Sequence, residues 1–151
     1  MTTVTLIQDR LYAINQTIAD VNARRTFPQE IAPAMLPLLV TLPGRSTRQS
    51  TRVGFGDDEQ TRTFRLIVVV EAWMAGIPTE SAQLLAETLT DTIQDEYLSR
   101  PRLELAGEAL ADVTRVVLGD DSGIIPFSTK FAAVEFPLAV TYLKSIQMNM
   151  E

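Results

Sequence analysis

The segment from Gly44 to Trp73, GRSTRQSTRVGFGDDEQTRTFRLIVVVEAW, decides the fold prediction for this chain of 151 residues. Residues 45–55 alternate weakly, GDDE at 56–59 has the Gly and Asp content of a tight turn, and residues 60–74 give the strongest strand signal. These features predict a long β-hairpin at about residues 44–66. Because TRTFR is polar and LIVVVEAW is almost wholly apolar, we expect a covered base and a projecting tip. Ten projecting residues would extend roughly 30 Å.

Two amphipathic helices are predicted, one on each side of the hairpin in the sequence. The first begins near Thr3 and runs for about twenty residues, and the second runs from about Thr79 to Leu98, with Thr79 as its N-cap. Apolar residues recur at spacings of three and four in both segments, which places them on one face of each helix. These residues are Val4, Ile7, Leu11, Ile14, Ile18 and Val21 in the first helix, and Ala82, Leu85, Leu89, Ile93 and Tyr97 in the second.

The remaining strands complete a single α+β domain over residues 1–151. Six alternate positions from Ala132 to Tyr142 share one apolar face, whereas Pro137 lacks an N–H donor, so this strand is expected to lie at an edge or to be kinked. The order of elements predicts a mixed or antiparallel sheet with both helices on one face. The other strands are predicted at 38–42, ended by Pro43-Gly44, and at 113–118 and 129–143, joined by a turn at 119–123.

The composition argues against an enzyme. The chain has no cysteine and no histidine, which excludes disulfides, thiolate metal sites and the commonest general base. No G-x-S-x-G elbow and no Gly-rich loop at the start of a helix is present. We therefore predict no catalytic residues, no metal and no cofactor. No signal peptide and no apolar run long enough to span a bilayer is recognised, so a soluble protein made in the cytoplasm is expected.

Five of the thirteen basic residues lie in the predicted hairpin, in a chain whose net charge is −6. Three interpretations are open: a solvated hairpin protected from edge pairing, a nucleic-acid contact, or a protein interface. Stacking on bases would need more aromatic residues than Phe55 and Phe64. A protein interface is favoured, because so long a hairpin cannot bury itself on its own domain and is complementary in charge to an acidic body. The predicted interface residues are Arg45, Arg48, Arg52, Arg62, Arg65, Phe55 and Trp73.

Two acidic turns are the other candidate sites. They contain Asp57, Asp58 and Glu59 in the first and Asp120 and Asp121 in the second. Carboxylates on two loops could bind Mg²⁺ or Ca²⁺, and a small metal-dependent hydrolase remains an alternative. Neither turn has the spacing of an EF-hand loop, and Asp with Gly is ordinary turn chemistry, so a purely structural role is favoured.

The layout of the chain resembles the tail terminator (tail completion) proteins of long-tailed bacteriophages. The likeness lies in the order of elements: an N-terminal amphipathic helix, a proline-rich passage, the strand LPLLVTLPG (36–44) and a long polar hairpin that returns through FRLIVVVEAW (64–73). A second helix, ESAQLLAETLTDTIQDEYL (80–98), and a closing hairpin, VTRVVLGDDSGIIPFSTKFAAVEFPLAVTYL (113–143), follow. The resemblance covers nearly the whole chain.

This resemblance implies a structural virion protein, assembled in the host cytoplasm and located in the tail neck. Such proteins form a ring, typically a hexamer, that caps the tail tube, stops its polymerisation and provides the head–tail joining surface. The implied partners are other copies of the chain, the tail tube protein and the head–tail connector (stopper) protein, while DNA passes through without sequence-specific binding. The arginines would contact a neighbouring subunit or the tube, and the acidic turns would face the lumen or a partner ring. The nearest alternative is another neck protein, such as a head-closure or connector protein.

Overall fold

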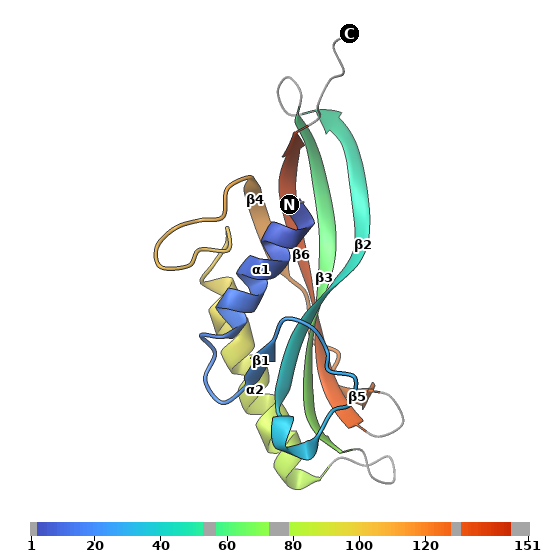
Figure 1. The fold of residues 1–151 in the computed structure, drawn as a ribbon. Coiled ribbons are helices and arrows are strands. Elements are labelled where there is room, and N and C mark those ends of the chain that lie inside the picture. The colour runs from blue at the N-terminus through green and yellow to red at the C-terminus, as the bar shows by residue number, and fades with distance from the viewer. Residues whose placement is uncertain (1–2, 53–56, 73–78, 128–130, 146–151) are drawn as a thin grey trace.

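A six-stranded mixed sheet with two helices forms the protein (Figure 1), in agreement with the predicted α+β class. The computed structural model describes residues 3–52, 57–72, 79–127 and 131–145. The strand order is β1-β2-β3-β6-β4, with β5 also paired to β6, and the β1–β2 pair is parallel. The elements are α1 (Thr3–Asn15), β1 (Asn22–Arg24), the 3₁₀ turn η1 (Pro33–Met35), β2 (Leu38–Arg52), β3 (Asp57–Ala72), α2 (Glu80–Leu98), β4 (Val113–Leu118), β5 (Ile124–Phe127) and β6 (Phe131–Ser145).

Both helices pack on the same face of the sheet. Alternate residues of β3 and β6 point to this face, which follows from the two-residue period of a strand. The predicted apolar faces of both helices and of β6 are confirmed, and Thr79 caps α2 by accepting a bond from the Ala82 amide at 3.2 Å. The buried sheet residues on this face include Phe64, Leu66, Val68 and Val70 in β3, and Ala132, Val134, Phe136, Leu138, Val140 and Tyr142 in β6.

The first helix is shorter than predicted. It ends at Asn15, after 13 residues, although Ile18 is still buried in the turn that follows. The Thr17 amide bonds the Ile14 carbonyl at 2.9 Å, an i→i+3 contact that tightens the end of the helix. Asp20 then adopts a left-handed conformation with φ 65°, which the short polar side chain of Asp tolerates. The helix was predicted too long because the apolar spacing continues to Ile18, which is buried although it lies beyond the end of α1.

The base of the sheet is covered on its second face as well. The segment from Phe27 to Leu36 crosses this face and packs on a second apolar cluster formed by β2, β3 and β6. Phe27 stacks on Phe127 with ring centroids 5.2 Å apart. Two-sided burial explains why β3 is apolar at consecutive positions here, as predicted. The buried members are Leu38, Val40, Ile67, Val69 and Ala133.

The β2–β3 hairpin differs from its prediction at both ends. β2 does not stop at Pro43-Gly44 but continues to Arg52, with a register shift between Pro43 and Ser46. A Cβ on Gly44 would lie 2.4 Å from the Thr63 carbonyl oxygen, so glycine permits the close approach at this irregularity. The predicted turn at 56–59 is also wrong, because residues 57–59 already belong to β3.

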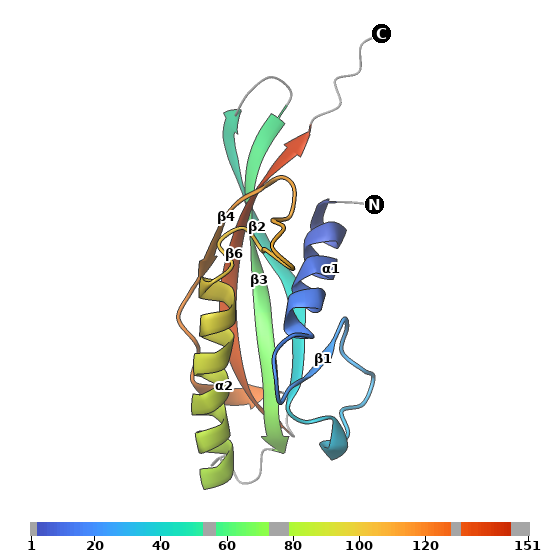
Figure 2. The same cartoon turned by 90° about the vertical axis from the view of Figure 1, so that its left-hand side faces the viewer.

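Fewer residues project from the body than the polarity of the hairpin predicted. β6 accompanies β3 along its whole length, from Ala72–Phe131 to Asp57–Ser145, so this part of the sheet has three strands (Figure 2). Tyr142 of β6 is only 1% exposed and lies opposite Gln60, so the helix face is covered up to this row. The polar residues of TRTFR are thus part of the body.

The last third of the chain does not form one two-stranded hairpin. β4 and β5 pair one after the other with the same side of β6, and residues 119–123 carry the chain between them. β6 is consequently an interior strand, and the prediction of an edge position for Pro137 is wrong. The Gly119 amide bonds the Pro137 carbonyl at 2.7 Å, so the missing N–H of Pro137 faces the gap between β4 and β5. Gly119 also leaves room for the proline ring, since a Cβ there would lie 2.6 Å from its Cγ.

A buried polar network ties α1, α2 and β2 together. The Tyr97 hydroxyl donates to Asn15 Oδ1 at 2.6 Å, and Asn15 Nδ2 donates to Thr41 Oγ1 at 2.9 Å. Asn15 is fully buried, Tyr97 is 2% exposed and Thr41 is 4% exposed. Each bond therefore satisfies a group that water cannot reach, and losing one partner leaves the other unpaired.

Replacing Tyr97→Phe should lower the free energy of unfolding by about 1–3 kcal/mol, because Asn15 Oδ1 loses its donor in a buried site. Urea denaturation followed by circular dichroism measures the change. Tyr12→Phe is the matched control, since the Tyr12 hydroxyl accepts only an exposed bond from Gln16, at 3.0 Å. Equal effects of the two substitutions would contradict a stabilising role for the network.

The stability of the protein should also fall at alkaline pH. Burial raises the pKa of Tyr97 above its ordinary value of 10.0. Because the folded state holds this proton more tightly than the unfolded state, the contribution is complete below about pH 10 and is lost as the pH rises further, by up to ~1.4 kcal/mol per pH unit. Denaturation curves between pH 9 and 11.5 measure this slope. The slope should be shallower in Tyr97→Phe, and identical slopes would assign the effect to other groups.

Candidate assembly interface

Among the five arginines predicted to form one interface, the three whose side chains are described, Arg45, Arg62 and Arg65, lie in different environments. Arg62 faces the helices and is partly buried; its Nη1 donates to the Gly44 carbonyl at 3.0 Å, while its buried Nε has no partner among the described residues. Arg65 faces the opposite side of the sheet, as expected for residues three apart in a strand. The spacing therefore splits these two guanidinium groups between the two faces.

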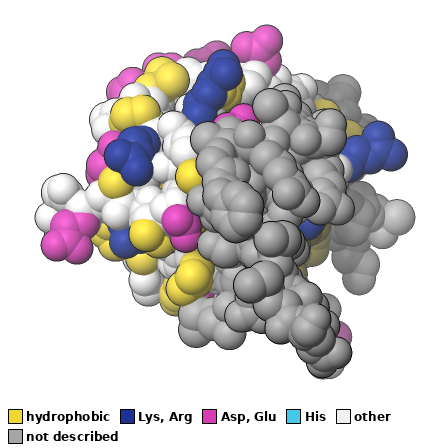
Figure 3. Space-filling model, turned by 90° about the horizontal axis from the view of Figure 1, so that it is seen from above, with side chains coloured by type: hydrophobic (Ala, Val, Ile, Leu, Met, Phe, Trp, Pro, Cys, Tyr) yellow, Lys and Arg dark blue, Asp and Glu magenta, His cyan; other side chains and the backbone are white. Residues whose placement is uncertain are grey.

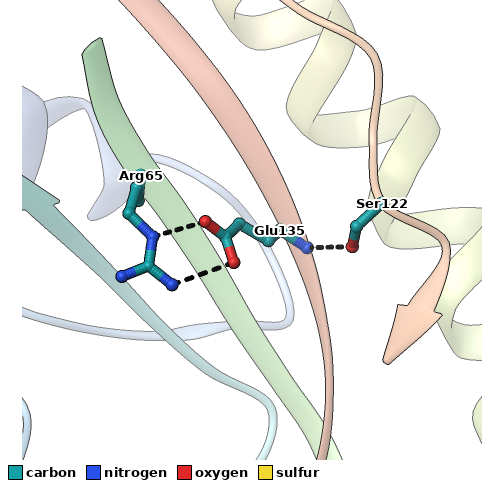
Figure 4. Close-up of polar contacts among 3 residues, drawn as sticks. All are labelled: Arg65, Ser122 and Glu135. Carbon is teal, nitrogen blue, oxygen red and sulfur yellow. Dashed lines mark hydrogen bonds and ion pairs between the residues drawn. The ribbon is translucent and has the colours of Figure 1, made fainter. Parts of the chain in front are cut away.

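Arg65 already has a partner within the chain (Figure 4). Its Nε and Nη2 donate to the two carboxylate oxygens of Glu135, the second at 3.0 Å, and this bidentate contact raises the pKa of Arg65 above its ordinary value. The Glu135 amide in turn donates to Ser122 Oγ at 3.0 Å. The contact joins β3 to β6 and to the 119–123 segment, so Arg65 acts within the fold.

Arg45 is the exposed arginine of this group. No hydrogen bond or ion pair engages its side chain in the part of the chain that the structure describes. Arg48 and Arg52 lie in β2, opposite Gln60 and Asp58 of β3, and only their backbone is described. Phe55 and Trp73 lie outside the described residues.

The outer edge of β2 is the most extended surface feature of the hairpin. β1 pairs only with residues 38–40, and from Thr41 to Arg52 no other described strand pairs with this edge. An edge strand of this length presents a row of backbone N–H and C=O groups that can pair with another strand. β4 forms the opposite edge of the sheet.

The charges of the protein are divided between these two edges. Residues 41–66 contain five arginines and three carboxylates, a net charge of +2, and include the β2 edge. Residues 80–121 contain ten carboxylates and three arginines, a net charge of −7, and form α2, β4 and their connection at the other edge. In the view along the sheet (Figure 3), most visible acidic side chains lie on the left and upper rims, the left being the side of the 104–112 segment in Figure 1. We call residues 80–121 the acidic flank.

The two acidic segments predicted as turns are far apart. Asp57 pairs with Ser145 of β6, whereas Gly119 bonds Pro137, eight residues earlier in the same strand. At ~3.4 Å per residue this separates them by roughly 27 Å. Asp121 Oδ2 accepts a bond from the Gly123 amide at 2.9 Å, which is a local turn contact, and Asp120 is exposed. The two segments therefore do not form one metal site, and no other group of three possible ligands exists among the described residues.

A surface hollow of about 590 Å³ is lined by residues of β3, β4 and β6, namely Glu59, Thr61, Thr114, Arg115, Val117, Ala139 and Thr141. Two further hollows lie elsewhere on the described part of the chain. One, of about 530 Å³, is lined mainly by apolar residues of the 27–31 segment with Phe127 and Phe131. The other, of about 510 Å³, lies on the acidic flank between α2 and residues 121–124. Its carboxylates, Glu87, Asp91 and Asp121, have no ion-pair partner in the described structure. Their free charges add to the negative potential of this edge.

No family model matches the sequence, and no curated protein matches it. Neither described helix is long and apolar enough to cross a membrane. Sequence reasoning missed the free edge of β4, because residues 113–118 were interpreted as one arm of a hairpin. The turn residues at 119–123 followed by the short apolar run IIPF (124–127) were the signal for two successive short strands.

Millimolar Mg²⁺ or Ca²⁺ should leave the melting temperature unchanged within about 1 °C, because the two acidic segments are too far apart to share an ion. Ligand binding to the native state alone would raise it. Differential scanning fluorimetry with 5 mM of each cation, against the same ionic strength of NaCl, measures the shift. An increase of several degrees that is lost in Asp120→Asn/Asp121→Asn would restore the metal-dependent hydrolase as a hypothesis.

Proposed function

We propose that the protein is the subunit of a homo-oligomeric ring that caps a bacteriophage tail tube, as the tail terminator proteins it resembles do. The single observation that carries this proposal is the division of charge between opposite edges of the sheet, +2 around β2 and −7 on the acidic flank. In a head-to-tail arrangement each copy places its basic edge against the acidic flank of the next. Such a heterologous contact generates rings when the rotation closes.

A two-fold arrangement is disfavoured by the same charges. An isologous contact through β2 would oppose two edges that each contain Arg45, Arg48 and Arg52, and a contact through the acidic flank would oppose ten carboxylates to ten others. Like charges facing each other across an interface are destabilising. The charge pattern therefore favours a repeating head-to-tail contact over a dimer.

Within the virion the ring would occupy the neck of the tail, between the tail tube protein and the head–tail connector (stopper) protein. Its binding to the last tube ring would stop tube polymerisation, and DNA would pass through its centre. If carboxylates such as Asp120 face the lumen, they repel the DNA phosphates and let the DNA slide without sequence preference. A head-closure or connector protein would share the ring but bind the portal side instead of the tube.

The decisive experiment combines mass measurement with partner binding. Light scattering at low ionic strength and negative-stain images should give closed rings, and the rings should sediment with purified tail tubes of the cognate phage. Rings that bind portal–connector complexes but not tubes would replace the terminator assignment with the head-closure alternative. A monomer that binds neither particle would overturn the proposal.

Arg45→Ala should weaken self-association about fivefold, because it removes an exposed, unpaired positive charge from the β2 edge. Arg65→Ala is the matched control: it removes the same charge, but from a side chain already paired with Glu135, and should change association less than twofold. Sedimentation velocity at 50 mM salt measures both. At 0.5 M salt the difference should shrink, because exposed charges are then screened. Equal effects of the two variants would show that only net charge matters.

A further inference from the structure

We propose that neighbouring copies join by strand addition, with the outer edge of β4 in one copy paired antiparallel to residues 43–47 of β2 in the next. This proposal rests on the self-assembly proposed above and specifies the contact that makes it. The hydrogen bonds would form between backbone groups of two open strand edges, and each edge would pair with another copy of this chain.

The two open edges lie at the same register across the sheet. Following the paired residues across β2, β3, β6 and β4 shows that the free part of β4 is level with the free part of β2 just beyond Thr41. Two rows across the sheet make this explicit: Ser46–Arg62–Val140–Val116 and Pro43–Phe64–Leu138–Leu118.

Equal height has a consequence for symmetry. A rotation about an axis roughly along the strands brings β4 of one copy beside β2 of the next without any shift along that axis. Repeated rotation without translation generates a closed ring, whereas a shift at each step would generate an open helix. The register of the sheet thus favours ring closure.

Strand direction and side-chain facing agree with this contact. β2 runs parallel to β6 and β4 runs antiparallel to it, so β4 of a neighbour in the same orientation lies antiparallel to β2. Ser46 lies in the row of Arg62, and Val116 in the row of Val140, on the face that carries the helices. The joined sheets would therefore keep all their helices on one side.

Among the described strands, the outer edge of β4 is open from Thr114, whereas on the β2 edge Pro43 has no N–H donor and the Gly44 carbonyl already accepts from Arg62 Nη1 at 3.0 Å. The Val113 carbonyl is occupied by Arg102 Nε at 3.0 Å and the Val113 amide by the Leu110 carbonyl, so the free edge of β4 begins at Thr114. From there to Leu118 no other described strand adjoins the outer side of β4. β5, by contrast, contains Pro126, which removes one donor from its short edge.

Charge just before β4 supports the same pairing. Asp112 precedes β4, and its carbonyl bonds the Leu143 amide, which places this acidic residue next to the row that contains Arg48 of β2. Glu108 lies in the same connection. The connection that leads into β4 is therefore acidic at the level where the sequence of β2 is basic, whereas β4 itself carries the exposed Arg115.

Engineered cysteines can test the register directly, because the natural chain contains none. Ser46→Cys and Val116→Cys are prepared as single variants, mixed in equal amounts and oxidised mildly. Directly opposed residues of antiparallel strands have Cα atoms about 4.5–5.5 Å apart, which suits a disulfide. We expect a covalent dimer in the mixture and none from either variant alone. The double variant Ser46→Cys/Val116→Cys should give a ladder of covalent oligomers that ends at the ring size.

The control mixture combines Ser46→Cys with Ser81→Cys, an exposed position at the start of α2, and should not cross-link. Circular dichroism of each reduced variant confirms its fold. Light scattering of the protein without cross-links tests head-to-tail assembly separately from the strand pairing. Oligomers without the Ser46–Val116 cross-link would overturn the strand pairing and leave head-to-tail assembly standing. A dimer from Ser46→Cys alone would overturn both.

Two further outcomes are informative. Cross-linked rings that fail to bind tail tubes would support the pairing and overturn the tail function. If neither oligomers nor cross-links form at millimolar protein, where even transient contacts are trapped, the pairing is wrong.

Discussion

The antiparallel pairing of β3 with β6 is the constraint on which the rest of the structure depends. It runs from Asp57–Ser145 to Ala72–Phe131 with one irregularity, between Val69 and Glu71. A shift of one residue would turn the apolar face of β6, from Ala132 to Tyr142, away from both helices. Because this face is completely buried, the register is strongly specified by the hydrophobic effect, and the helices can dock in only one way.

The central position of this pair determines what lies at the edges. With β3 and β6 in the middle, β2 and β4 become the outer strands, and each helix covers one half of the sheet: α1 contacts β1 and β2, whereas α2 contacts β3 and β4. The acidic α2 is thus carried to the β4 side and the basic part of the hairpin to the β2 side. The separation of acidic and basic residues between the two edges therefore follows from the strand order.

Hydrophobic periodicity predicted those features of the fold that depend on residues close together in the sequence. The helix faces, the apolar face of β6 and the two-sided burial at the base of β3 were all visible in the residue periodicity. The extent of β2 was not, because Pro43-Gly44 has the composition of a strand end, and only the approach of Thr63 shows that this glycine serves an irregularity. The sharing of β6 by β4 and β5 is a long-range pairing with no local signature.

The positions of the candidate interface residues were predictable only in part. The clustering of arginines pointed to the β2–β3 hairpin as a candidate interface, and a two-residue period already separates Arg62 from Arg65. The partner of Arg65 could not be predicted, since Glu135 is seventy residues away in the sequence. The separation of the two acidic segments likewise depends on where each joins β6, which turn composition does not encode.

An open edge such as that of β2 carries a risk of unspecific pairing, and its sequence limits that risk. Pro43 removes a donor, and arginines along the strand oppose the approach of an identical edge. The same charges are attracted to the carboxylate of Asp112, which precedes β4, although β4 itself carries Arg115. In the proposed contact, the residues that oppose the pairing of two β2 edges would therefore also select a different partner, with charge making the choice and the backbone supplying the hydrogen bonds. On this argument the arginines of the hairpin act mainly in discrimination, and the strength of association depends on how many backbone bonds the two level edges can form.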